Sequence, residues 1–81
     1  MERTDIFNKL NEIFVDILDL EEDPILTDET TADDIEGWDS IANVQLMERI
    51  QEVFGIKFSA YEISSWIDVG EMVDGIVKKL S

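Results

Sequence analysis

Apolar residues recur every three or four positions in three stretches of this 81-residue chain, and this spacing constrains the fold more than any other feature. Residues 4–18, 40–54 and 69–80 each place most of their large apolar side chains on one face of a helix with 3.6 residues per turn. Such a helix must bury its apolar face against another element. The spacing predicts an all-α fold, a small four-helix bundle with three longer helices and one short third helix. We expect a single domain over residues 1–81.

Capping residues indicate where these helices begin and end. Thr4 is the expected N-cap of the first helix, and Gly55 is the expected left-handed C-cap of the second. Ser59 and Glu62 have the spacing of a capping box, which predicts a brief third helix, and Asp68 has analogous spacing before the last helix. The connections after the second helix are short, which favours an antiparallel bundle.

The helical period is lost in residues 19–39, which hold ten acidic residues, no basic residue and the only proline, Pro24. A loop this long inside a compact domain is uncommon and is often functional. We expect Ile25, Leu26 and Ile35 to anchor it to the core. Asp19, Glu21 and Asp23 have the spacing of the first ligands of a calcium-binding loop. However, Pro24 occupies the position that needs glycine and Thr30 the position that needs glutamate, so no dedicated metal site is predicted.

Composition excludes several classes of function. The chain has no cysteine and no histidine, so it lacks thiolate metal ligands and the commonest general base. Its net charge of −14 disfavours nucleic acids and anionic membranes as partners and favours a basic protein partner, although for the charge alone plain solubility is the better explanation. No apolar run spans a membrane and no signal-peptide pattern begins the chain, so we expect a cytoplasmic protein. We also expect a monomer.

The pair Asp39-Ser40 precedes the second predicted helix, and its simplest interpretation is a helix cap. Three features favour a further role. Gly37 and Trp38 form a turn that presents the pair, the acidic loop delivers the chain to this point, and Ile41 follows on the face away from the core. A serine hydroxyl at a helix N-terminus is a favourable place for a phosphate. Because this chain has no base to activate that hydroxyl, another protein must do so.

The segment Gly37-Trp38-Asp39-Ser40-Ile41, which opens a helix ending in Glu52-Val53-Phe54-Gly55-Ile56, resembles the acyl carrier protein signature. The resemblance extends over nearly the whole chain, including its length, acidity and helix order. It implies that Ser40 receives 4′-phosphopantetheine from coenzyme A through a phosphopantetheinyl transferase. It also implies that Asp39 helps this transferase bind magnesium. The working thiol then belongs to the prosthetic group, which accounts for the absence of cysteine.

The resemblance also implies a partner surface. Ile41 stands where the family usually has leucine, Val44 matches a second partner-facing apolar position, and Glu48 and Glu52 lie nearby on the second helix. The chain is then a non-catalytic carrier of acyl thioesters for acyl-loading and acyl-transferring enzymes. Fatty-acid-type carriers have a strongly acidic second helix. Here that helix has two acids, one of them offset by Arg49, which suggests a specialised carrier; neutral variation on a solvated face explains the pattern equally well.

Two alternatives stay open. A peptidyl or aminoacyl carrier shares the helices and the serine but takes a different cargo. An acidic helical adaptor would bind a basic partner and use Ser40 only as a cap.

Trp38 and Trp66 are expected to pack at the edge of the core. If an acyl chain enters the bundle, as the family permits, the residues expected to line it are Leu46, Met47, Ile50, Phe54, Ile63, Val69 and Met72.

Overall fold

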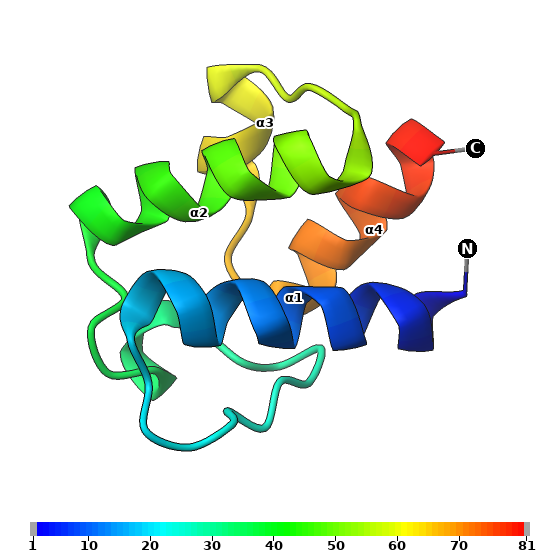
Figure 1. Ribbon diagram of the computed structural model, residues 1–81. Helices are drawn as coiled ribbons and strands as arrows, with labels where there is room; N and C mark the ends of the chain where they lie inside the picture. The colour runs from blue at the N-terminus through cyan, green and yellow to red at the C-terminus, as the bar shows by residue number, and fades with distance from the viewer. Residues whose placement is uncertain (1, 81) are drawn as a thin grey trace.

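The computed structural model describes residues 2–80, which form four α-helices and one short 3-10 helix (Figure 1). The elements are α1 (Arg3–Leu18), η1 (Ala32–Asp34), α2 (Ser40–Phe54), α3 (Ala60–Ser65) and α4 (Val69–Leu80). The predicted all-α fold, with three longer helices and a short third one, is confirmed. Within residues 2–80, no helix has both the length and the apolar character needed to cross a bilayer.

The two longest helices, α1 and α2, run antiparallel and pack side by side, and α4 packs against α1 (Figure 1). Because a long loop joins α1 to α2, the chain can cross the end of the bundle and return along α1. An ion pair links the two helices on the surface: Arg49 Nη1 lies 2.7 Å from Asp16 Oδ2. The start of α2 therefore lies at the end of the bundle where α1 finishes.

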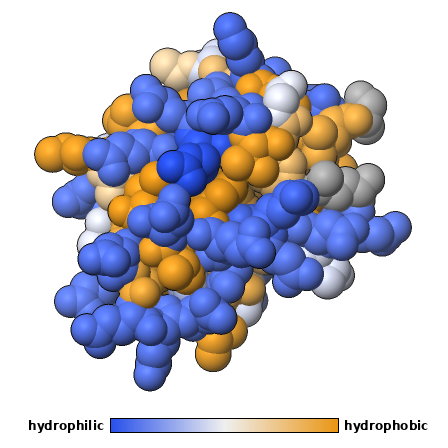
Figure 2. All heavy atoms as spheres, in the orientation of Figure 1, coloured by the Kyte–Doolittle hydropathy of each residue, from blue (hydrophilic) through white to orange (hydrophobic). Residues whose placement is uncertain are grey.

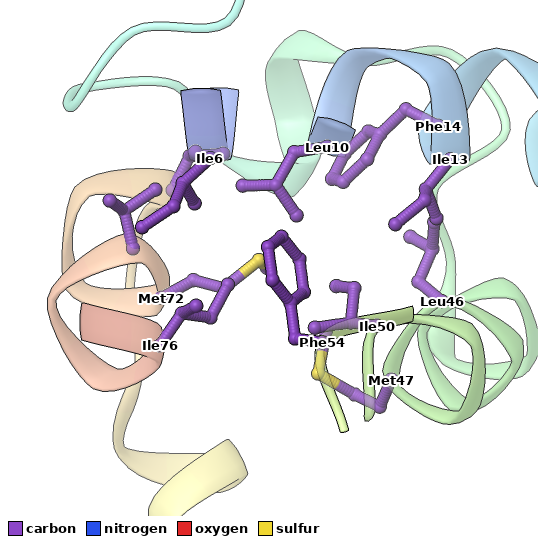
Figure 3. Close-up of a cluster of buried hydrophobic side chains, with 12 residues drawn as sticks. Ile6, Leu10, Ile13, Phe14, Leu46, Met47, Ile50, Phe54, Met72 and Ile76 are labelled. Atoms are coloured by element: carbon purple, nitrogen blue, oxygen red, sulfur yellow. The ribbon is translucent and has the colours of Figure 1, made fainter. Parts of the chain in front are cut away.

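The apolar faces of α1, α2 and α4 meet in one core (Figure 3). Each of these helices contributes four of its buried side chains, and together they are Ile6, Leu10, Ile13, Phe14, Leu46, Met47, Ile50, Phe54, Val69, Met72, Val73 and Ile76. Burying one such side chain contributes roughly 1.5–3 kcal/mol. The core face predicted from the helical spacing is thus largely confirmed.

Two residues predicted on apolar faces are exposed. Val53 is 45% exposed because it lies at the edge of the α1–α2 contact, beside a surface groove that it shares with Ile13 and Arg49. Leu80 is exposed in the last turn of α4, beyond the end of the core. Helical spacing gives the direction of a side chain but not how far the neighbouring helix extends, so both errors occur at the borders of the core.

The expected N-cap at Thr4 is wrong, because the helix is capped two residues earlier and α1 begins at Arg3. Glu2 is the N-cap, and its backbone N–H donates to Asp5 Oδ2 over 3.3 Å. The predicted ends of α2 are correct, and Gly55 closes it in the left-handed conformation, with φ of 67°. The cap expected at Asp68 is also present, since its Oδ1 accepts the backbone N–H of Glu71 at 2.9 Å.

The loop between α1 and α2 is held by backbone hydrogen bonds to the start of α4. The N–H of Val69 donates to the carbonyl of Thr30 over 2.8 Å, and the N–H of Gly70 donates to the carbonyl of Asp28 over 3.0 Å. A Cβ atom at residue 70 would lie 2.6 Å from that Asp28 oxygen, so only glycine permits this approach. Thr30 is itself buried, and its Oγ1 accepts the backbone N–H of Thr27 at 2.9 Å.

Two of the three predicted loop anchors are confirmed. Leu26 and Ile35 are partly buried and pack against the core. Ile25 is the exception: it is 87% exposed and anchors nothing. Apolar character alone did not distinguish the three, because the backbone path set by Thr30 and Asp28 directs neighbouring side chains to opposite sides.

Helix α3 is short and is stabilised at its start by the predicted capping box. Ser59 Oγ accepts the N–H of Glu62 at 3.1 Å, and Glu62 Oε1 accepts the N–H of Ser59 at 3.0 Å. Lys79 Nζ lies 3.2 Å from the same carboxylate and so joins α4 to α3. The Ser59 hydrogen bond and the nearby Lys79 lower the pKa of Glu62 below its ordinary value.

This lowered pKa gives α3 a pH-dependent contribution to stability. A carboxyl whose folded pKa is depressed stabilises the fold above its unfolded pKa of about 4.3, and this contribution is lost as pH falls through the folded pKa. Glu62→Gln keeps the capping hydrogen bond but removes the charge. We expect its denaturation midpoint to lie below the parent's at pH 7 and to match it at pH 3.

Glu12→Gln is the matched control for this measurement, because it removes one exposed carboxylate of α1 that forms no ion pair within residues 2–80. Urea denaturation at pH 7, 5 and 3 compares the three proteins. A Glu62→Gln midpoint that stays below the parent's by the same amount at pH 3 would contradict the assignment.

Candidate functional site

A tight turn leads the loop into α2. Gly37 has φ of 85°, in the left-handed region that favours glycine. The N–H of Trp38 donates to the carbonyl of Ile35 over 3.3 Å, and the N–H of Asp39 donates to the carbonyl of Gly37 over 3.1 Å. The turn predicted at Gly37 and Trp38 is therefore present, and it reverses the chain immediately before the helix.

Asp39 alone performs the capping of α2. Its Oδ1 accepts the N–H of Ala42 at 2.8 Å, and its carbonyl accepts the N–H of Asn43 at 2.8 Å. Ser40 is the first residue of the helix and is exposed. Within residues 2–80, the Ser40 hydroxyl makes no hydrogen bond. The helix therefore does not need this hydroxyl for its own stability.

The start of α2 has the features that an attached phosphate needs. The first amides of a helix have no partner inside it. At this end Asp39 satisfies the amides of Ala42 and Asn43, which leaves those of Ser40 and Ile41 without a partner among the described residues. Unpaired amides and the positive end of the helix dipole both favour an anion. The residues present thus fit a phosphodiester on Ser40.

Trp38 is held on two sides and forms a wall beside Ser40. Its ring meets Phe14 of α1 edge to face, with ring centroids 4.9 Å apart. Its Nε1–H donates to Asn43 Oδ1 over 3.0 Å. Trp66 packs in the same manner against Phe58, with centroids 4.7 Å apart. The expectation that both tryptophans pack at the core edge is confirmed.

A cleft of about 340 Å³ opens directly beside Ser40. Its walls come from η1, the start of α2, α3 and the link to α4, and its lining residues are Ala32, Trp38, Asp39, Ser40, Asn43, Ile63, Trp66, Ile67, Asp68 and Met72. This volume lies at the low end of the range for small-molecule sites. Mostly apolar walls with a few polar groups are typical of such sites.

The lining predicted for a buried acyl chain matches this cleft only in part. Ile63 and Met72 line it. The other five predicted residues belong to the packed core, namely Leu46, Met47, Ile50, Phe54 and Val69. Asn43 and Asp68, which were not among the residues expected to line an acyl chain, line the cleft as well. Their place in the wall of the cleft depends on contacts between distant segments, so no local sequence pattern indicated it.

The outward face of α2 carries the apolar residues expected there. Ile41 is 73% exposed and Val44 is 59% exposed, and Glu48 and Glu52 are exposed as well. Arg49 points elsewhere, since its guanidinium pairs with Asp16 of α1 rather than with either glutamate. The predicted surface residues therefore lie exposed along one helix that begins at Ser40.

Nowhere in residues 2–80 do three acidic side chains converge so that they could hold a metal ion. The chain contains no histidine or cysteine. What the site provides is an exposed hydroxyl, an anion-favouring helix start and an adjacent cleft.

Comparison with known proteins agrees with this geometry. Residues 8–76 match the model of the phosphopantetheine attachment site family. An acyl carrier protein from Borreliella burgdorferi (strain ZS7) is 32% identical over 79 residues, which are 98% of each chain. One from Petrotoga mobilis (strain DSM 10674 / SJ95) is 30% identical over 81 residues, covering 100% of this chain and 94% of its own. The solution structure of a holo acyl carrier protein from Geobacter metallireducens superposes with a TM-score of 0.82, at 34% identity, covering 90% of this chain and 83% of its own.

The fold and the site define a small helical carrier whose second long helix begins at an exposed serine. The chain belongs to the phosphopantetheine attachment site family, as an acyl carrier protein. Its cofactor is covalently bound 4′-phosphopantetheine, which supplies the thiol that holds an acyl group as a thioester. The protein is a carrier and not an enzyme.

The capping role of Asp39 can be tested separately from any modification. Asp39→Ala removes the acceptor for the Ala42 amide and should destabilise the fold by about 1 kcal/mol, whereas Asp39→Asn retains a capping oxygen and most of the stability. Urea denaturation of the two unmodified variants measures both values. Equal losses in the two variants would contradict the capping assignment.

Proposed function

We propose that Ser40 Oγ is the attachment point of the 4′-phosphopantetheine arm. The observation that carries this proposal is the division of roles at the start of α2, where Asp39 caps the helix and the Ser40 hydroxyl is exposed without a partner. The two unpaired amides and the cleft beside Ser40 support it. Family membership argues against the adaptor interpretation, in which Ser40 would serve only as a cap.

The neighbouring residues take supporting roles in this proposal. Gly37 and Trp38 shape the turn that presents Ser40, and Asp39 contributes to recognition by the phosphopantetheinyl transferase and its magnesium. The exposed side chains of Ile41, Val44, Glu48 and Glu52 then form the docking surface for acyl-loading and acyl-transferring enzymes with basic patches. The matched relatives are named acyl carrier proteins, which favours an acyl over an aminoacyl cargo.

The attachment site can be tested by intact mass. After incubation with coenzyme A, magnesium and a promiscuous phosphopantetheinyl transferase, the parent should gain the mass of one phosphopantetheine. Ser40→Ala should gain none, while its stability stays within about 1 kcal/mol of the parent's, since the hydroxyl has no structural partner. A folded parent that gains no mass, or a Ser40→Ala variant that does, would overturn the assignment.

We also propose that this is a specialised carrier with dedicated partner enzymes rather than the general carrier of fatty acid synthesis. Support comes from the distribution of charge. Residues 19–39 hold ten acids, whereas α2 holds only Glu48 and Glu52. Because electrostatic complementarity sets partner choice, a shift of acidity from α2 into the loop should change which enzymes bind.

The specialised role predicts slow handling by general fatty acid enzymes. With the arm attached, the chain should be acylated and elongated by a standard fatty acid synthase system more slowly than the housekeeping carrier of that system. The measurement is the initial rate of elongation with each carrier at equal concentration. Equal rates would show that the altered charge pattern has no consequence for partner choice.

A further inference from the structure

The loop between α1 and α2 displays an apolar side chain that the fold does not use. Ile25 is 87% exposed, the highest value among the exposed large apolar residues of the described chain. It borders a surface groove whose lining combines apolar, hydroxyl and acidic side chains. We define the loop surface as Asp23, Ile25, Glu29 and Asp34, all of which border this groove.

The loop surface is built on a fixed backbone. The carbonyls of Thr30 and Asp28 accept hydrogen bonds from the first amides of α4, and Leu26 packs against the core beside Ile25. Arg3 of α1 also pairs with the Asp28 carboxylate. Because the backbone is fixed, Ile25 is exposed before any partner binds. Binding would therefore cost little conformational entropy for ordering the loop.

Charge indicates what kind of partner fits. Residues 19–39 carry ten acids and no base, and hydrophilic side chains cover much of the molecular face drawn in Figure 2. Within residues 2–80, Asp23 and Glu29 form no ion pair. An exposed isoleucine among unpaired carboxylates is complementary to a protein surface with an apolar pocket bordered by lysine and arginine.

The loop surface lies close to Ser40 through the short helix η1. Ala32, its first residue, lines the cleft beside Ser40, and Asp34, its last residue, lines the groove beside Ile25. A 3-10 helix rises only about 2 Å per residue. A protein that engages the Ser40 hydroxyl can therefore reach the loop surface at the same time.

We propose that the loop surface is a second docking site for the phosphopantetheinyl transferase, in addition to the surface around Ser40. The inference rests on the proposed attachment at Ser40. The transferase is the best-suited partner because it must recognise the chain before the arm is present, from protein surface alone. Enzymes that act later can also recognise the arm and its cargo. Ile25 provides the short-range contact and the carboxylates provide long-range attraction.

Steady-state kinetics of Ser40 modification, with the transferase from the same organism and coenzyme A, test the apolar contact. Ile25→Ser should raise the KM for the carrier about tenfold, the size expected for truncating one well-packed contact, and should leave kcat unchanged. Val53→Ser is the matched control, because Val53 is also exposed but lies thirteen residues along α2 from Ser40. Its KM should equal the parent's. Thermal denaturation of each variant verifies that it is folded.

A second pair of variants tests the charge. Asp23→Asn with Glu29→Gln removes two charges from the loop surface, and Glu2→Gln with Glu71→Gln removes two exposed charges that border neither of the two grooves lined by Asp23. At low salt the loop pair should lower kcat/KM more than the control pair does. At about 1 M salt, where screening acts within about 3 Å, the two pairs should converge.

The outcomes separate the two proposals. If the parent is modified at Ser40 and Ile25→Ser shows the parent's KM, the loop surface is not a docking site, while the attachment at Ser40 stands. Equal effects of the two charge pairs at low salt would also overturn the inference. If the folded parent is not modified at all, the proposed function itself fails.

Discussion

The amides at the start of α4 impose the constraint on which much of this structure depends. The first amides of a helix have no partner within it, and buried ones must find another acceptor. Val69 and Gly70 are both buried, and the carbonyls of Thr30 and Asp28 provide the acceptors. One set of hydrogen bonds thus completes α4 and fixes the acidic loop. Glycine at residue 70 is required because any Cβ would collide with Asp28. With the loop fixed, the chain reaches the turn at Gly37 along a defined path.

At the start of α2, two adjacent residues could cap the helix, and the choice between them decides whether the Ser40 hydroxyl is left exposed. Aspartate and serine are both good N-caps, so the sequence alone permits either residue to cap α2. In the structure Asp39 accepts the Ala42 amide and Ser40 becomes the first helical residue. The same residue choice that stabilises the helix therefore leaves a hydroxyl exposed beside two unpaired amides. In the proposed function, the helix cap and the attachment point are therefore different side chains.

Sequence analysis succeeded where the determinants are local. The ends of α2, the capping box of α3 and the outward direction of Ile41 follow from spacing and capping within a few residues. It failed where contacts with a distant segment determine the position of a side chain. The exposure of Ile25 depends on which loop carbonyls reach α4, and the position of the Trp38 ring depends on Phe14 and Asn43. The candidate site was predictable as far as Asp39 and Ser40, but the cleft beside them was not, because α3 and α4 form part of its walls.

The composition also suits a carrier that must not react with its own cargo. A thioester is lost when a nucleophile attacks it, and the most effective side chains at neutral pH are the cysteine thiolate and the histidine imidazole. This chain has neither. The residues around the cleft are carboxylates, an amide, a hydroxyl and apolar groups. In the proposed function a partner enzyme supplies the nucleophile that releases the cargo, so the partner determines when the cargo leaves.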